Sequence, residues 1–169
     1  MALEMRELLD TIPQTGKVCW IGVRSGRGEP IRVLDSVEVC MEKGLDGDRF
    51  DGKAGDKRQV TLIQKEHLPV VGAILGTDAV DPVLLRRNIV VEGINLMSLK
   101  NRQFEIGGVV LLGTGNCPPC SQMETALGAG GYNAMRGHGG LTASVVQAGT
   151  INVGDEVKFL APVLEENRT

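Results

Sequence analysis

Short apolar or alternating segments separated by glycine-rich turns are the feature that most restricts the fold of this chain. Of its 169 residues, 23 are glycine, and glycine adopts the positive-φ conformations that many tight turns need. The segments lie at residues 17–24, 31–39, 59–63, 89–92, 103–106, 109–112, 141–147 and 157–160. Because few helical crossovers separate them, they predict about eight short strands in a mainly β barrel with two or three short helices, in preference to a parallel α/β sheet.

Local patterns add detail to this prediction. Ile31, Val33, Val37 and Val39 occupy alternating positions, which predicts that they share one face of a sheet. Gly107-Gly108 joins two apolar segments, and such a pair predicts a β-hairpin. We expect helices at residues 2–10, 64–75 and 122–127, and turns around residues 149 and 154.

The composition limits the classes of partner. A chain of this length forms one domain with a real core. The net charge of −3 and the aromatic content of 3% argue against binding nucleic acid through bulk charge or base stacking. No apolar run reaches the length of a membrane span, and no signal peptide is recognised. We therefore expect a cytoplasmic protein with no nucleic-acid and no membrane partner.

The expected domain organisation has three parts. Residues 1–15 form an N-terminal helix and extension, residues 16–161 form the barrel, and residues 162–169 form a flexible tail.

Cys117-Pro118-Pro119-Cys120 is the segment with the clearest chemical potential. It follows a predicted strand and precedes a predicted short helix. Proline fixes its own φ and restricts the preceding residue to extended conformations. The loop is therefore stiff, and the direction of Cys120 is fixed. A sulfur held in this way can ligate a soft metal, exchange disulfides or act as a nucleophile.

A lone C-x-x-C segment leaves several interpretations open. A structural zinc site usually needs four ligands, and this chain offers no second pair at suitable spacing. His67 and His138 are far apart in the sequence, and Cys19 and Cys40 lie singly in apolar segments, where we expect core thiols. A thioredoxin-type pair needs a βαβ context, which the surrounding pattern lacks.

Two charged segments each have two interpretations. Residues 44–58 carry four acids and four bases among glycines. They form either a solvated loop that neutralises itself or a loop whose amides and bases bind an anion. Arg86-Arg87 stand directly before a predicted strand. They form either a solvated edge, which is the commoner role, or a fork for phosphate or carboxylate.

Residues 128–140 carry six glycines. They do not open a helix after a strand, so they fail the context test for a dinucleotide-binding loop. We expect a mobile, lid-like segment with His138 exposed in it.

Six separate stretches together resemble the MOSC family, named for the C-terminal domain of molybdenum-cofactor sulfurase. They occur in the family's order and are G-L-D-G-D-R-F at 44–50, K-R-Q-V-T-L-I-Q at 57–64, R-R-N-I-V-V-E-G at 86–93, I-G-G-V-V-L at 106–111, C-P-P-C at 117–120 and A-G-T-I-N-V-G-D-E-V at 148–157. The resemblance covers roughly residues 16–161. It implies a MOSC-type β-barrel similar to the barrel domain of pyruvate kinase, in agreement with the strand pattern.

The resemblance also implies a cofactor and a set of site residues. In relatives that bind molybdenum, especially the amidoxime-reducing enzymes, a cysteine at the end of a C-x-x-C segment holds the metal. That position corresponds to Cys120, which is thus the implied metal ligand and catalytic residue of a molybdenum cofactor (Mo-molybdopterin). Asp48 is a candidate proton donor or loop organiser. The implied cofactor contacts are Lys57, Arg58, Arg86, Asn88, Pro118, Pro119 and Thr142.

The sequence departs from the molybdenum reductases at several points. Those enzymes carry an additional N-terminal β-barrel half, for which this chain has no room. Pro118-Pro119 stand where some relatives have a small polar residue and arginine, and Lys57-Arg58 replace a Thr-Ser pair. The details of how a cofactor is gripped therefore differ from those relatives.

Three functions are compatible with these residues. The first is reduction of small N-hydroxylated compounds at Cys-ligated molybdenum, with electrons from a separate flavin or iron–sulfur protein. The second is a carrier without redox turnover, which holds sulfur from a sulfur donor as a persulfide on Cys120 or delivers a cofactor. The third is a thiol–disulfide module, which needs both Cys117 and Cys120.

Overall fold

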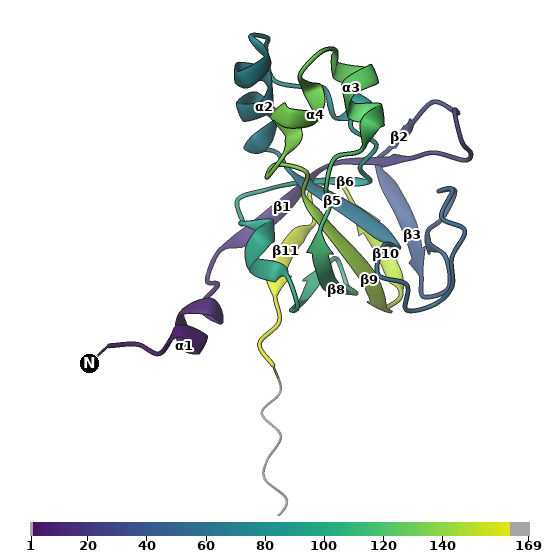
Figure 1. Cartoon of the computed structure of the whole chain (residues 1–169). Helices are drawn as coiled ribbons and strands as arrows, with labels where there is room; N and C mark the ends of the chain where they lie inside the picture. The colour runs from purple at the N-terminus through teal and green to yellow at the C-terminus, as the bar shows by residue number, and fades with distance from the viewer. Residues whose placement is uncertain (1, 163–169) are drawn as a thin grey trace, which may run out of the picture.

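Seven strands close into a mixed β-barrel in this computed structural model, which describes residues 2–162 (Figure 1). The strands follow the order β11-β7-β8-β9-β5-β6-β1, and β11 pairs back onto β1. Their bounds are β1 (Thr15–Val23), β5 (Val60–Gln64), β6 (Ile89–Glu92), β7 (Gln103–Ile106), β8 (Val109–Asn116), β9 (Leu141–Gln147) and β11 (Glu156–Phe159). The pair β5–β6 is parallel, whereas the other pairs of the barrel are antiparallel. The predicted mainly β barrel is confirmed.

Smaller elements surround the barrel. Strand β2 (Arg32–Leu34) pairs with the end of β1, and a second sheet has the order β10 (Gly149–Asn152), β3 (Ser36–Cys40) and β4 (Gly44–Leu45). The helices are α1 (Met5–Leu9), α2 (His67–Leu75), α3 (Ser121–Leu127) and α4 (Gly131–Met135), with 3-10 turns η1 (Pro82–Leu84) and η2 (Leu96–Leu99). Figure 1 shows α2, α3 and α4 grouped at one end of the barrel, while α1 projects from the opposite end.

The core has two parts that share the strands β5 and β6. Leu62 and Ile89 belong to the cluster that fills the barrel, whereas Ile63 and Val90 belong to a second cluster beneath the helices. Parallel strands joined by a helical crossover are buried on both faces, and α2 is that crossover here. The chain therefore uses its one parallel pair to connect the barrel with the helical end.

The hairpin between β7 and β8 forms where the sequence predicts it. Gly107 has φ 56° and Gly108 has φ 91°, and two consecutive positive values characterise a type I′ turn. Ile106 pairs with Val109 directly across this turn.

Residues 31–39 do not share one sheet face, so that prediction is wrong. Val37 and Val39 are buried in the small sheet, whereas Val33 is 56% exposed on β2. The chain passes from one sheet to the other between β2 and β3, and the carbonyl of Asp35 accepts a hydrogen bond from the amide of Val153. Strands β4 and β10 were not predicted, because each is short and glycine-rich and resembles a turn in the sequence.

Residues 128–140 are not the mobile lid that the glycine content suggests. They contain α4, where Ala134 and Met135 are buried in the core cluster beneath the helices. The Glu124 carboxylate accepts hydrogen bonds from the amides of Gly130 (2.7 Å) and Tyr132 (2.9 Å). These bonds lower the pKa of Glu124 and connect α3 to α4.

The chain ends lie at the margin of the fold. Helix α1 has no buried residue, and an ion pair of 2.8 Å between Asp10 and Arg102 connects its end to the barrel. Residues 163–169 of the predicted flexible tail lie outside the described residues. Within residues 2–162, no helix combines the length and the apolar character that a membrane crossing requires.

Candidate functional site

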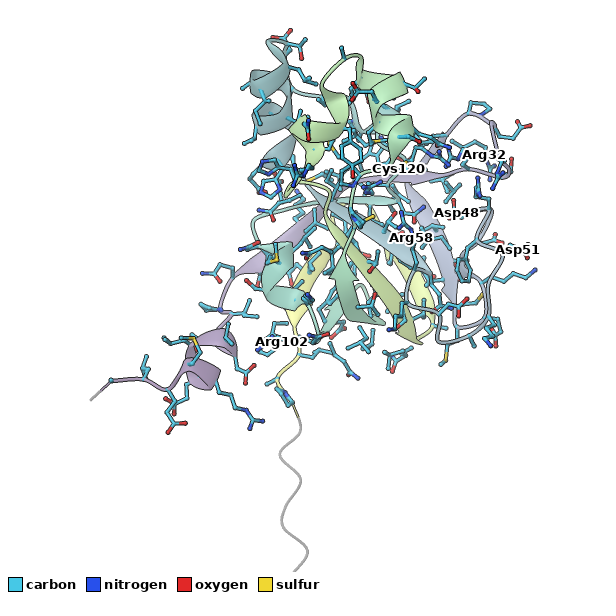
Figure 2. All side chains as sticks on the ribbon, viewed as in Figure 1. Arg32, Asp48, Asp51, Arg58, Arg102 and Cys120 are labelled. Atoms are coloured by element: carbon cyan, nitrogen blue, oxygen red, sulfur yellow. The ribbon has the colours of Figure 1, made fainter. Side chains whose placement is uncertain are left out.

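Five arginines and one thiol line a pocket of about 340 Å³ near the helical end of the barrel. We call it the arginine pocket; its arginines are Arg24, Arg49, Arg58, Arg86 and Arg87. Two carboxylates, Asp48 and Asp51, and the sulfur of Cys120 also line it. In Figure 2, Cys120 lies below α3, with Asp48 and Arg58 further down the same side of the barrel. The pocket therefore has an excess of positive charge.

The guanidinium groups of this pocket lack ion-pair partners among the described residues. In the described part of the chain, none of the five arginines forms an ion pair. Arg24 Nε and Arg49 Nη1 are buried and have no hydrogen-bond acceptor. Burial lowers the pKa of Arg24 and of Arg86, and repulsion from neighbouring arginines lowers both further. Buried donors without acceptors are costly, so the arrangement fits a site that is completed by an anion.

The adjacent Arg86 and Arg87 have different surroundings. Arg86 is half-buried, lines the pocket and has φ 59°, a left-handed conformation that is unfavourable for a residue with a Cβ. Arg87 is only 3% exposed, and its guanidinium donates to four carbonyls. The commoner role of a solvated edge is therefore wrong for Arg87.

The bonds of Arg87 hold the cysteine loop in place. Its Nε donates to Gly139 O at 2.8 Å and its Nη1 to Leu85 O at 2.9 Å. Its Nη2 lies 3.4 Å from both Cys117 O and Pro118 O. One buried side chain thus connects the start of β6 with the C-P-P-C loop and with the segment before β9.

The two cysteines of the loop face different environments. Cys117 is 1% exposed in the protein interior, whereas Cys120 is exposed, precedes α3 and lines the arginine pocket. The core thiol is therefore Cys117. Cys19 and Cys40, which we expected in the core, are only half-buried.

Asp48 and Asn88 line the pocket but make structural contacts with their side chains. Asp48 Oδ1 accepts the backbone amide of Arg24 at 3.0 Å, which attaches the loop after β4 to the end of β1. Asn88 Oδ1 accepts both the amide and the hydroxyl of Thr61 at 3.1 Å, and its Nδ2 donates to Gly22 O at 3.2 Å. The acceptor of Asn88 is thus engaged by the protein, which leaves a single N–H for a ligand.

Four of the implied contact residues do not line the pocket: Lys57, Pro118, Pro119 and Thr142. Three of them, Lys57, Pro118 and Thr142, make hydrogen bonds to other parts of the chain. Thr114 Oγ1 donates to Lys57 O and lies 2.8 Å from Thr142 Oγ1. Arg58 directly follows this anchored residue and does line the pocket, together with Asp48, Arg86, Asn88 and Cys120.

Arg24, Arg49 and Arg87 were not named as cofactor contacts from the sequence, although Arg49 and Arg87 lie in segments for which anion binding was one of two interpretations. Arg24 ends an apolar segment, and Arg49 lies in a loop that also carries acids. Neither pattern reveals that the side chains converge, because they come from different strands and loops. Arg87 was recognisable only as one half of an arginine pair.

Comparison with known protein families gives a match over most of the chain, and comparison with solved structures gives a likeness of fold. The MOSC domain model matches residues 50–158. The crystal structure of YuaD from Bacillus subtilis superposes with a TM-score of 0.76 at 18% identity, covering 90% of this chain and 100% of that protein. YiiM from Escherichia coli has a TM-score of 0.67 at 17% identity, covering 87% of this chain and 71% of that one.

YiiM from Geobacillus stearothermophilus has a TM-score of 0.70 at 14% identity, covering 86% of this chain and 75% of that one. At these identities the likeness concerns the fold alone. Comparison with curated protein sequences gives no significant match.

Proposed function

The chain belongs to the MOSC domain family, generally associated with molybdenum-cofactor binding, and from this premise we propose that its arginine pocket holds Mo-molybdopterin. We further propose that the protein reduces small N-hydroxylated compounds there. The observation that carries the proposal is one pocket in which an exposed thiol, Cys120, meets five arginines without ion-pair partners among the described residues. A cofactor that combines a soft metal with an anionic phosphate needs both kinds of group.

The residues of the pocket fit such a group. Guanidinium forks bind phosphate in bidentate fashion, and the buried N–H groups of Arg24 and Arg49 without acceptors suit that role, beside Arg58 and Arg86. The thiolate of Cys120 is a suitable ligand for a soft, redox-active metal. The pocket of about 340 Å³ also lies within the range of small-molecule and cofactor sites, about 300–1,000 Å³.

When bound, the cofactor supplies two-electron chemistry at molybdenum. In the overall reaction the N–O bond of the substrate breaks, the substrate takes up two electrons and two protons, and the products are the amine and water. Asp48 keeps a carboxylate at the pocket and is the proposed proton donor or loop organiser. Hydrogen bonds of Lys57, Pro118 and Thr142 support the segments beside the pocket, and Pro119 stiffens the cysteine loop. The electrons come from a separate donor protein, because we recognise no flavin or iron–sulfur motif in the sequence.

The test is metal analysis combined with activity. The protein is purified from a host that makes the cofactor, and molybdenum per chain is measured by elemental analysis. Reduction of benzamidoxime is followed with reduced methyl viologen as electron donor. We expect Cys120→Ala to lose most of the molybdenum and the activity, whereas the thiol control Cys40→Ala retains both. Wild-type protein without molybdenum, or equal molybdenum in the Cys120→Ala variant, contradicts the proposal.

The exposure of Cys120 favours a second candidate, a sulfur carrier. Cys120 is exposed beside cationic groups while Cys117 is buried, and an accessible thiol in an electropositive environment suits a persulfide. A reductant-sensitive adduct of about 32 Da on Cys120, seen by mass spectrometry, supports this function. Cys117→Ser separates both candidates from thiol–disulfide exchange, which needs the pair of thiols.

A further inference from the structure

A second pocket, of about 240 Å³, is lined by both histidines of the chain. We call it the histidine pocket; its side chains include Gln64, His67, Asn95, Met97, Asn116 and His138. His67 is the first residue of α2, and His138 lies in the segment between α4 and β9. The fold therefore brings together two imidazoles that are 71 positions apart, although no local pattern indicates that they are neighbours. The proposed function uses neither of them.

The two imidazoles are in contact but lack polar partners. Their ring centroids are 4.9 Å apart, and the ring planes meet at 73°. The Nδ1 atoms of both rings are buried without a hydrogen-bond partner in the described protein. An edge-to-face contact returns less free energy than two buried polar atoms without partners cost. Packing alone therefore does not account for the pair, whereas a ligand bound by both Nδ1 atoms would satisfy them.

The spacing of the rings matches joint ligation of one metal ion. Two imidazoles that bind one zinc ion at about 2.1 Å with a tetrahedral angle have ring centroids about 5 Å apart. The observed separation is 4.9 Å. Burial and the neighbouring His138 lower the pKa of His67, while Glu66 opposes this effect. Imidazole ligates metals in its neutral form.

We propose that His67 and His138 form a two-histidine site for a divalent transition-metal ion of the zinc type, separate from the arginine pocket. Imidazole nitrogen is a good ligand for zinc, copper and nickel. The other side chains of the histidine pocket are neutral: three amides, the thioether of Met97 and the apolar side chain of Leu96. No arginine or lysine lines the pocket, so no positive side chain at the site opposes the ion.

The composition of the site also limits its affinity. In residues 2–162, no group of three or more His, Cys, Asp or Glu side chains could hold a metal. Gln64 Oε1 is engaged by the amide of Leu96, and Asn95 Oδ1 is engaged by the amide of Met97. Water, Met97 or Asn116 would complete the coordination. With only two strong protein ligands, we expect micromolar affinity, weaker than that of a four-ligand structural zinc site.

Nuclear magnetic resonance of the imidazole nitrogens tests the site directly. The chain has only two histidines, so the full-length 15N-labelled protein gives four ring-nitrogen signals. Zinc chloride is added stepwise, and the signals are followed by long-range proton–nitrogen correlation. We expect one nitrogen of each ring to shift in step with the other and to saturate at one ion per chain. If the signals do not move at millimolar zinc, or if only one ring responds, the two-histidine site is refuted.

Variants supply a second measurement. Equilibrium dialysis with zinc is carried out in a Cys120→Ser background, which removes the exposed thiol as a competing ligand. We expect His67→Gln and His138→Gln each to weaken binding at least tenfold, while Arg136→Gln, two residues from His138 and outside the pocket, leaves it unchanged. Zinc affinity equal to wild type in both histidine variants overturns the proposal. If a variant does not fold, the titration of the wild-type protein decides. Neither readout involves molybdenum, so failure here is distinguishable from failure of the proposed cofactor site.

Discussion

The arginine pocket and the histidine pocket adjoin the same piece of backbone but differ in charge. Asn116 and Gly140 line the histidine pocket, while Arg87, which lines the arginine pocket, donates to the carbonyls of Cys117 and Gly139. We call residues 116–117 and 139–140 the shared wall. One side of it faces guanidinium groups, and the other faces the two imidazoles and several amides. The same stretch of chain therefore separates a site suited to anions from one suited to cations.

Close backbone approach makes this shared wall thin. The amide of Cys117 donates to Gly140 O at 2.8 Å. A Cβ on Gly139 would lie 1.9 Å from Cys117 O, and a Cβ on Gly140 would lie 1.9 Å from Leu62 O. Gly140 also has φ 93°, which favours glycine. The glycines that suggested a flexible lid are thus positions where two backbone segments pack closely against each other.

Removal of Arg87 is the largest perturbation that we expect, because it affects both pockets. Arg87→Met keeps much of the side-chain volume but leaves four carbonyls without their donor. We expect a loss of about 3 kcal/mol in the free energy of unfolding, since buried groups without partners cost about 1–3 kcal/mol each and some will find water. Urea denaturation measures this loss. Both the imidazole signals and the environment of Cys120 should change.

Arg86→Met is the matched control for Arg87→Met. It removes the same charge one residue earlier, at a half-buried side chain that forms no ion pair among the described residues. We expect its urea midpoint to stay close to that of wild type. Equal stability of both variants would mean that Arg87 does not support the shared wall.

The two cysteines of the C-P-P-C loop differ in burial, and we expect their serine variants to differ in stability. Cys117→Ser places a hydroxyl in the interior at a position that is 1% exposed. We expect a loss of about 1–3 kcal/mol, the cost of burying a polar group with imperfect bonding. Cys120→Ser changes an exposed residue, and we expect an effect within about 0.5 kcal/mol. Thermal unfolding measures both, and a more destabilised Cys120→Ser would reverse the assigned roles of the two sulfurs.

Arg86→Gly should affect only the arginine pocket. We expect it to weaken anion binding there without lowering the stability of the fold. Glycine adopts the φ of 59° found at this position without strain, so we expect stability to be unchanged or raised by up to about 1 kcal/mol. Loss of the guanidinium should weaken binding of inorganic pyrophosphate, a probe for phosphate groups, by about tenfold. Calorimetry at low salt measures this binding.

Two outcomes would contradict the prediction for Arg86. One is unchanged pyrophosphate affinity, which would remove this arginine from the anion site. The other is a loss of zinc binding at the histidine pocket in the same variant, which would mean that the shared wall does not isolate the two pockets.

The fold was accessible from the sequence because its strands carry their own signals. Apolar segments such as residues 89–92 and 103–106 became β6 and β7 with the expected bounds, and Gly107-Gly108 specified the hairpin by its backbone preferences. Strand β10 was not predicted because it has only one buried apolar residue, Ile151, among glycine and polar residues. Pairing with β3, a tertiary effect, decides its conformation.

The candidate site was only partly accessible, since it depends on contacts between distant segments. Cys120 and Arg58 could be nominated through their motifs. Local sequence did not reveal that Arg24 and Arg49 reach the same pocket, or that His67 meets His138. Nor did it distinguish Arg86 from Arg87, because the local sequence does not show that Arg86 adopts a left-handed turn conformation while Arg87 is buried. Burial and backbone conformation, not residue type, separate their roles.

The smallest expected effect concerns the pH dependence of stability and belongs to the histidine pocket. The pKa of His67 is lowered in the folded protein, first by burial and then by the charge of His138, while Glu66 acts in the opposite direction. In the unfolded chain, histidine titrates near about 6.5. As the pH falls below that value, the unfolded state therefore binds more protons than the folded state. The contribution of His67 to stability is complete above that pH and is lost as the pH decreases.

Urea denaturation between pH 7.5 and 5.5 measures this linkage. We expect the free energy of unfolding to decrease across the interval in the wild type and in Arg86→Gly, and to decrease less in His67→Gln, because glutamine does not titrate. Arg86→Gly is informative here because it changes the charge of the arginine pocket while leaving both imidazoles in place. If His67→Gln keeps the full wild-type slope, other groups cause the dependence. If Arg86→Gly flattens it instead, charge in one pocket influences protonation in the other, and the electrostatic separation of the two sites fails.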